Sequence, residues 1–295
     1  MKIFRISQYK HAITSESEGQ LPLLKEAVKE RLGRNIRRID RFTQLSLMGA
    51  SDCRGDLSFP INTGIVMASY FGSLNNTFNV LSSMFQCSSR PSPYEFIHTV
   101  SNAASYYLAR ELELTSHNLF ISQQHAALQA CLKLAEIDLD CLNVNAVLIG
   151  QVSEVATPFD VYRERVNIKL PHVLHESSNW FLLANELKNE KSVASIVLNI
   201  EGTDAQVLSV QIKNALNEMS KKQNVIARLD EAFCSSKNDL VDCINVNQPW
   251  VNSLESSSEA LFDFLQSDEF NVLLMVERVN RYKWSALVIS KLELD

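Results

Sequence analysis

Side chains that could act as nucleophiles, bases or metal ligands are few and scattered in this sequence. Its 295 residues include 6 histidines and 6 cysteines. His172 and His175 have the i, i+3 spacing of a ligand pair, but no cysteine or acidic cluster completes a metal site beside them. None of the motifs GxSxG, GxGxxG, GxxxxGK[ST] and HExxH occurs. These observations predict no metal, no cofactor and no obvious catalytic centre.

The cysteines and glycines also speak against a catalytic centre. No two cysteines form a CxxC pair, and several lie in apolar segments, which predicts free, buried thiols in a reducing compartment. Glycine lets the backbone approach a substrate closely, yet there are only 8 glycines and none after Gly202. The last third of the chain is therefore poorly equipped to build a catalytic loop.

Composition limits the kinds of partner. The net charge is −6 and 46% of the residues are apolar. An acidic chain is not typical of proteins that bind nucleic acid or anionic membranes, because both need a basic face. No apolar run approaches the about 20 residues that span a bilayer, and the N-terminus lacks the apolar core of a signal peptide. We expect a cytoplasmic protein with neither nucleic acid nor a membrane as its partner.

Predicted strands and helices alternate along the chain. Apolar, β-branched runs predict strands at 64–72, 118–122, 145–150, 180–186, 195–202, 224–230, 271–279 and 284–294, the last two as an antiparallel hairpin. Amphipathic segments predict helices at 21–32, 40–50, 73–86, 96–112, 125–137, 206–222 and 253–266. Such alternation predicts a layered α/β fold in a single domain over 1–295, with its sheets covered on both faces.

Several segments resemble one known family in the same order along the chain. RRIDRFTQLSLMGA (37–50) is similar to the RRMDRFTQLALAA helix of β-ketoacyl synthases, which belong to the thiolase superfamily. The other matching segments are GIVMASYFGSL (64–74), SPYEFIHTVSNAASYYLARELEL (92–114), NLFISQQHAALQACLKLA (118–135), AVLIGQVSE (146–154) and HESSNWFLLANE (175–186). The resemblance implies a thiolase-like fold with α-β-α-β-α layers, compressed relative to full-length ketosynthases. It also implies two pseudo-duplicated halves, about 1–160 and 161–295.

The segment 118–135 falls where ketosynthases carry their nucleophilic cysteine, on a sharp turn at a helix N-terminus. There the helix dipole lowers the thiol pKa, and backbone N–H groups form an oxyanion hole. In this sequence Gln124 takes the position of the cysteine, and an amide is not a nucleophile. Cys131 lies two turns downstream on the same helix and cannot replace it. A shift of register does not help, because residues 118–130 contain no cysteine.

The two histidines of the family also lack counterparts. EAFCSSKND (231–239) matches the first histidine segment but has Glu231 at the histidine position, and NSLESSSE (252–259) matches the second but has Ser253 there. VNRYKWS (279–285) replaces a Gly-rich hairpin of the family. The resemblance therefore implies a catalytically inactive relative of the ketosynthases.

QHAALQA (124–130) resembles the EQAGGLDA pattern of chain length factors of type II polyketide synthases. Such a factor pairs with a catalytic β-ketoacyl-ACP synthase as a heterodimer, meets acyl carrier protein through that complex, and closes the far end of the partner's acyl tunnel. The resemblance implies the same role here, and the modest length suits the aryl polyene subtype. The alternatives are a scaffold without influence on chain length, and an enzyme such as a Gln-type malonyl-ACP decarboxylase.

By the same resemblance, the helix predicted at 73–86 reaches the tunnel of the partner. A bulky residue there blocks extension of the acyl chain, and a small one permits it. Thr77 and Phe78 are the expected gate, although these side chains could equally be ordinary helix core. The full set of candidates for the tunnel wall is Leu74, Thr77, Phe78, Leu81, Tyr94 and Phe96.

Overall fold

The computed structural model describes residues 1–13, 21–60, 62–141, 144–165, 174–219, 224–234 and 257–292. Within these residues the strands join in one sheet, in the order β3-β2-β4-β5-β1-β6-β9-β8-β7. The strands are β1 (Lys2–Ile13), β2 (Thr63–Ser69), β3 (Asn118–Ser122), β4 (Ala146–Ser153), β5 (Leu174–Ala184), β6 (Ala194–Gly202), β7 (Val225–Leu229), β8 (Val272–Asn280) and β9 (Lys283–Lys291).

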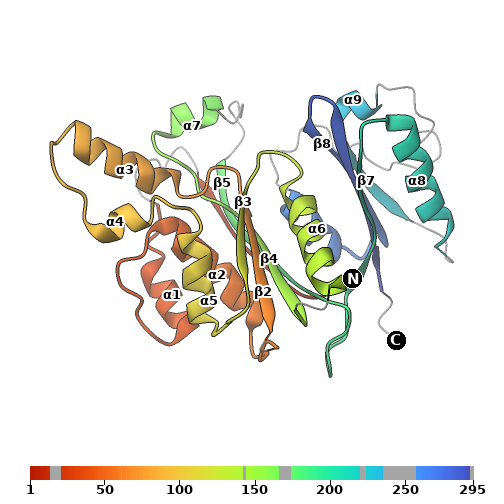
Figure 1. The fold of residues 1–295 in the computed structure, drawn as a ribbon, viewed down its shortest axis with the longest axis horizontal. Coiled ribbons are helices and arrows are strands. Elements are labelled where there is room, and N and C mark those ends of the chain that lie inside the picture. Colours follow the sequence, from red (N-terminus) through yellow and green to blue (C-terminus); the bar gives the residue numbers. More distant parts are fainter. Residues whose placement is uncertain are drawn as a thin grey trace.

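The helices lie between these strands in the sequence (Figure 1). They are α1 (Lys25–Leu32), α2 (Arg41–Arg54), α3 (Leu74–Phe85), α4 (Pro93–Ile97), α5 (Ala103–Glu111), α6 (Ala127–Asp140), α7 (Phe159–Arg165), α8 (Ala205–Asn217), α9 (Glu231–Cys234) and α11 (Ser257–Gln266). Helix α2 begins at Asp40, whose side chain accepts a hydrogen bond from the Thr43 N–H and so satisfies an otherwise unpaired donor.

The pairing of the strands repeats along the sheet. In the first part β2 and β4 run parallel, β4 and β5 antiparallel, and β5 and β1 antiparallel. In the second part β7 and β8 run parallel, β8 and β9 antiparallel, and β9 and β6 antiparallel. The two parts meet where β1 pairs with β6, over Lys2 and Ile3 alone. Such a short junction lets the sheet turn, so that each part presents its own faces for helices to cover.

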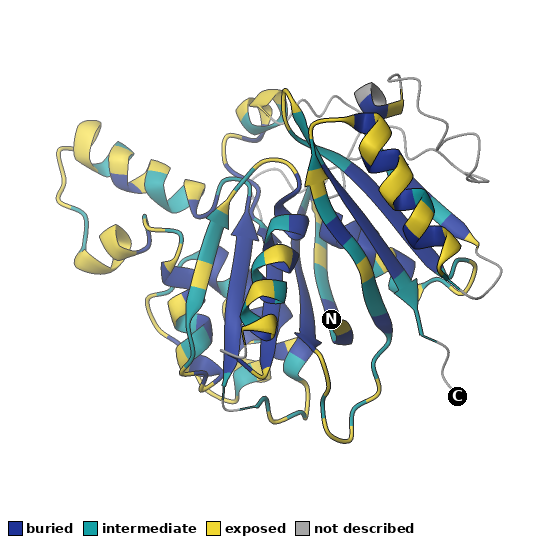
Figure 2. Ribbon diagram, turned by 45° about the vertical axis from the view of Figure 1, so that its right-hand side comes forward, coloured by how far each residue is buried: buried dark blue, intermediate teal, exposed yellow. Residues whose placement is uncertain are grey.

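Three hydrophobic clusters show how the helices cover the sheet. Helices α2 and α5 pack on the outer face of the first part, around Phe42 and Trp180. Helices α6 and α11 fill the space between the two parts, where Leu132 belongs to the same cluster as Phe181 and Leu287. Helix α8 covers the far face of the second part. Figures 1 and 2 show the resulting α-β-α-β-α layers, with the strands buried, which confirms the predicted fold class.

Trp180 is the largest fully buried side chain, and two glycines make room for it. A Cβ at Gly49 of α2 would lie 2.5 Å from the Trp180 ring, and one at Gly150 of β4 would lie 2.4 Å from it. Neither distance is tolerated by a real Cβ, so both positions require glycine for close packing. Two of the sparse glycines, Gly49 and Gly150, are therefore used in the core.

Besides shifted ends and the short helices α7 and α9, which were not predicted, the structure differs from the predicted elements in two places. Strand β1 was not predicted, because its polar side chains do not alternate regularly with its apolar ones; it forms because β5 pairs with it along its length. The single helix predicted at 96–112 is two helices, α4 and α5. The Ser92 capping box starts α4, and the chain then turns at His98, which is buried.

Candidate functional site

Residues 123–126 connect β3 to α6 and form the elbow. Ala126 caps α6 in the left-handed conformation, with φ 54° and ψ 30°. For a residue with a Cβ this conformation costs roughly 1–2 kcal/mol, so the surrounding contacts must hold it. The side chain of Gln123 donates to the His125 carbonyl at 2.5 Å. Gln124 is exposed, so the strained residue of the elbow is Ala126 and not the residue at the expected nucleophile position.

A carboxylate of this chain occupies the N-terminal end of α6. The Ala126 N–H donates to Glu277 Oε2 at 3.1 Å. The Ser257 hydroxyl lies 2.7 and 2.8 Å from the two oxygens of the same carboxylate. Arg228 Nε lies 3.6 Å from Glu277 Oε1, and both side chains are only 13% exposed. The backbone N–H at the N-cap of α6 is therefore bonded to an internal anion.

The positions assigned to the two family histidines are only partly described. Glu231 begins α9, but its side chain lies outside the described residues, as does Ser253. Asp230, the residue before Glu231, accepts a hydrogen bond from the Trp284 indole at 3.2 Å and lies 3.5 Å from Arg278. Trp284 belongs to segment 279–285, which by the family resemblance stands in place of a Gly-rich hairpin. This end of the second part of the sheet is therefore held by polar contacts within the chain.

The cysteines of the described residues are free, and their burial differs from the prediction. Cys131 and Cys53 are buried, and burial raises the pKa of each thiol to about 12. A thiol with such a pKa stays protonated at neutral pH and is a poor nucleophile. The expectation of free thiols agrees with this structure, but the expected burial fails for three of them, because they lie at or just after helix ends. These exposed thiols are Cys87, Cys141 and Cys234.

Other expectations about sites can be placed only in part. His172 lies outside the described residues, and within those residues no group of three or more His, Cys, Asp or Glu side chains could hold a metal ion. A cavity of about 150 Å³ lies between β7, β8 and α11, with Ile226 and Phe264 in its wall. The tunnel candidates of α3 and α4 do not line this cavity.

The candidates for the tunnel wall lie on an exposed surface. Val80 is the only residue of α3 that is buried, and Thr77 is half-buried with its hydroxyl donating to the Ser73 carbonyl at 3.2 Å. Five candidates are well exposed: Leu74 (38%), Phe78 (46%), Leu81 (47%), Tyr94 (44%) and Phe96 (61%). Phe78 is therefore not ordinary helix core, whereas Thr77 is half-buried.

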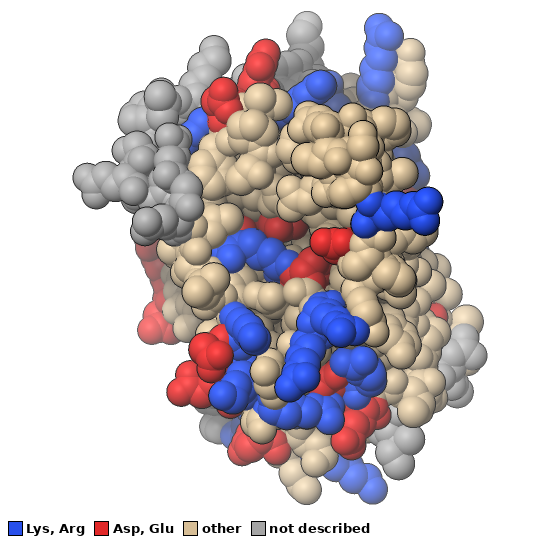
Figure 3. All heavy atoms as spheres, turned by 90° about the vertical axis from the view of Figure 1, so that its left-hand side faces the viewer, with Lys and Arg blue, Asp and Glu red and all other residues tan. Residues whose placement is uncertain are grey.

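More apolar side chains are exposed on α3, α4, α5 and β3 and on the turn that follows α4. We call this surface the α3–β3 face. Its residues are Leu74, Phe78, Leu81, Met84, Phe85, Tyr94, Phe96, Ile97, Val100, Tyr106 and Leu119. Figure 2 shows α3 and α4 largely exposed beside β3, the strand that ends the sheet. In Figure 3 uncharged side chains cover the upper part of the side where α3 and α4 lie, and Lys and Arg gather below.

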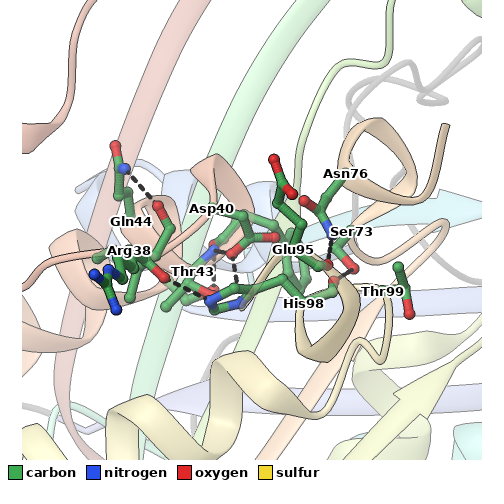
Figure 4. Close-up of polar contacts among 12 residues, drawn as sticks. Arg38, Asp40, Thr43, Gln44, Ser73, Asn76, Glu95, His98 and Thr99 are labelled. Carbon is green, nitrogen blue, oxygen red and sulfur yellow. Dashed lines mark hydrogen bonds and ion pairs between the residues drawn. The ribbon is translucent and has the colours of Figure 1, made fainter. Parts of the chain in front are cut away.

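Polar contacts hold α4 and the start of α3 against the body of the protein (Figure 4). The Ser73 hydroxyl donates to the His98 carbonyl at 2.6 Å, and the Asn76 amide donates to the Glu95 carbonyl at 2.8 Å. The His98 ring is 3% exposed; its Nε2 lies 2.9 Å from the Arg38 carbonyl. The candidate helices are thus presented in a defined position.

The residues that carried the family resemblance have structural roles. His98 Nδ1 lies 3.3 Å from the carboxylate of Asp40, the cap of α2. Burial raises the pKa of Asp40, while the hydrogen bond from Thr43 and the charge of His98 oppose this rise. Arg41 binds the fully buried Glu176 through two hydrogen bonds of 2.8 and 2.5 Å. This motif therefore fixes the α2 layer and, through His98, the segment before α5.

A buried carboxyl anchors the first turn of α3. The Asn75 amide donates to Glu154 at 2.9 Å and to the Val155 carbonyl at 2.8 Å, and its oxygen accepts from the Thr157 N–H at 2.8 Å. Burial raises the pKa of Glu154 to about 8. At neutral pH this side chain is therefore mostly a neutral acid, which suits its 6% exposure.

Comparison by sequence finds no relative: no family model matches this chain, and no curated protein matches it. Within the described residues no helix is long and apolar enough to cross a membrane. The likeness to known proteins therefore rests on structure.

Several solved structures are similar over almost the whole chain. A chain of the ishigamide ketosynthase/chain length factor has a TM-score of 0.75 and 16% identity, covering 99% of both chains. A chain of the AntDE:AntF complex, a type II acyl carrier protein with its ketosynthase, has a TM-score of 0.70 and 14% identity, covering 99% of this chain and 100% of that one. The 3-oxoacyl-[acyl-carrier-protein] synthase III of Aquifex aeolicus has a TM-score of 0.54 and 11% identity, covering 98% and 99%.

These likenesses agree with the layered fold described above. At such low identity they establish the fold and leave the activity to be argued from the site. The chain has the thiolase-like fold of β-ketoacyl-ACP synthases and of ketosynthase/chain length factor complexes.

Proposed function

We propose that this chain is a non-catalytic chain length factor, which pairs with a catalytic β-ketoacyl-ACP synthase and limits the acyl tunnel of that partner. The complex would act in polyketide or aryl polyene biosynthesis in the cytoplasm and would receive its chains from acyl carrier protein. The observation that carries the proposal is the α3–β3 face, which lies beside an elbow without a cysteine.

The exposed strand β3 supports a partner on this side. An edge strand presents unpaired N–H and C=O groups, and monomeric proteins commonly protect such an edge with charged residues or proline. Residues 118–122 read NLFIS and contain neither, and Leu119 is 40% exposed. Soluble monomers also rarely expose large apolar patches. A second subunit that covers β3 and the neighbouring helices would bury both features.

The chemistry at the elbow supports the absence of catalysis. Gln124 supplies no nucleophile, and the thiol of Cys131 is buried. The Glu277 carboxylate at the Ala126 N–H would repel the carboxylate of a malonyl group brought to the same place. This repulsion speaks against the alternative of a malonyl-ACP decarboxylase.

Co-expression with the neighbouring catalytic ketosynthase tests the proposal. We expect a stable complex of one copy of each chain, detected by size-exclusion chromatography with light scattering. Leu119→Asp should abolish the complex, because it places a charge on the strand edge that the partner covers. Val210→Asp is the matched control, since Val210 is 57% exposed on the outer helix α8. A chain that stays monomeric beside the ketosynthase would contradict the proposal.

A further inference from the structure

Four elements meet at the Glu277 carboxylate. Glu277 comes from β8, the Ala126 N–H from the start of α6, Ser257 from the first turn of α11, and Arg228 from β7. The N-cap backbone of α6 and a side chain at the start of α11 therefore donate hydrogen bonds to one carboxylate, and a guanidinium adds positive charge. Ala126 is 2% exposed and Ser257 is 5% exposed, so these donors are shielded from bulk water.

Further hydrogen-bonding capacity surrounds this carboxylate. Ser285 lies directly opposite Glu277 in the β8–β9 pair, so the two side chains share one face of the sheet. Gln129 lies one turn after Ala126 on α6. Both are buried, at 0% and 1% exposure, and neither the Ser285 hydroxyl nor the Gln129 carboxamide has a hydrogen-bond partner in the described part of the chain. Ser285 thus adds a buried hydroxyl beside Glu277, and Gln129 adds a buried carboxamide on the first turn of α6.

We propose that the start of α6 is still a carboxylate-binding site, and that Glu277 is its occupant supplied by the chain itself. Burying a carboxylate is unfavourable unless donors replace its water, and this set of donors does so. The side chain thereby excludes acyl groups that end in a carboxylate from the degenerate elbow. The inference rests on the proposed function only in treating the elbow as the former catalytic position; the carboxylate site stands on the contacts.

The experiment removes the internal carboxylate and offers one from solution. In Glu277→Ala, the Ala126 N–H, the Ser257 hydroxyl and the Arg228 guanidinium lose the carboxylate that they contact. We therefore expect the melting temperature of the purified chain to fall by about 5–10 °C at pH 7 in sodium chloride. Sodium acetate or formate at the same ionic strength should restore at least half of this loss, with a saturable dependence on concentration. The wild-type protein should show no such difference between the salts.

Glu201→Ala is the matched control. Glu201 lies on β6, which β9 separates from β8 in the sheet, and pairs with Lys283 at the surface, with its side chain 40% exposed. Its removal changes the net charge equally but opens no buried site, so acetate should have no specific effect. An equal rescue of both variants, or no rescue of Glu277→Ala, would overturn the inference.

A third variant covers the case in which Glu277→Ala does not fold. Glu277→Gln keeps the shape and one acceptor oxygen but loses the charge. We expect a smaller fall in melting temperature without rescue by acetate, because the site stays filled. A melting temperature equal to that of the wild type would overturn the inference. These melting temperatures are measured on the isolated chain. A failure of the carboxylate-site inference can therefore be told apart from a failure of the chain to bind the ketosynthase.

Discussion

At the scale of single residues, the elbow carries no cysteine and is held by contacts around Ala126. Gln124 is exposed, the strained position is Ala126, and the nearby backbone donor binds Glu277. Gln124, which the family resemblance puts at the nucleophile position, is thus less constrained by contacts than Ala126. The role of the tunnel candidates stays a prediction, but their exposure means that substitutions there change a surface and leave the core intact.

The gate prediction concerns Thr77 and Phe78. In a reconstituted complex, Thr77→Trp should shorten the product by filling the end of the tunnel, and Phe78→Ala should lengthen it by removing bulk. Mass spectrometry of the carrier-bound products measures both. Val210→Trp on α8 should change nothing, because it lies on the outer layer. Unchanged product lengths in an intact complex would favour the scaffold alternative.

At the scale of elements, α3 depends on its first turn for its position. Its exposed residues pack on little else, since Val80 alone is buried, while Asn75 binds both Glu154 and the Thr157 N–H. A helix held mainly by such contacts is the kind of element that opens locally at low free energy. The position of the proposed gate is therefore set by polar anchors outside the gate residues.

Removal of this anchor gives a prediction for α3. Asn75→Ala should speed hydrogen–deuterium exchange in residues 74–85, because the helix loses its bonds to the body of the protein, and should leave α6 unchanged. Asn76→Ala is the control, since Asn76 makes one exposed bond to the Glu95 carbonyl. Equal protection of α3 in the wild type and in Asn75→Ala would show that other contacts hold the helix.

At the scale of the whole molecule, a buried acid links stability to pH. Burial raises the pKa of Glu154 from the ordinary 4.5 of a glutamate to about 8 in the folded protein. Between these values the folded state holds the proton that the unfolded state has released. The free energy of unfolding therefore falls as pH rises from about 4.5 to about 8, and this contribution is flat outside that range.

Glu154→Gln tests this linkage. The amide oxygen can still accept from Asn75 and carries no charge at any pH, so the variant should be more stable than the wild type at pH 8.5, by about 1–4 kcal/mol. Near pH 4.5 the difference should be small, because both side chains are then neutral. Urea unfolding across this range measures the effect. A difference that does not depend on pH would contradict the raised pKa.

Much of the architecture could be predicted from local patterns. The continuous apolar runs of β2, β4 and β8 marked buried strands, and their alternation with helices marked the layers. Strand β1 could not be predicted, because its polar residues are placed in a strand only by the pairing with β5. The break between α4 and α5 could not be predicted either, because it follows from the burial of His98. The division near residue 160 stays a prediction; the repeated strand pairing changes over between β5 and β6.

The sequence by itself determined that no cysteine stands on the elbow, because a missing side chain is visible without a fold. It also determined the layered fold, because the period of apolar residues reflects which faces are buried. Only the tertiary structure decided that the residues of α3 face solvent, and that Glu277 lies on the Ala126 N–H from 151 positions away. Contacts between such distant segments depend on how layers stack, and local patterns do not contain that information.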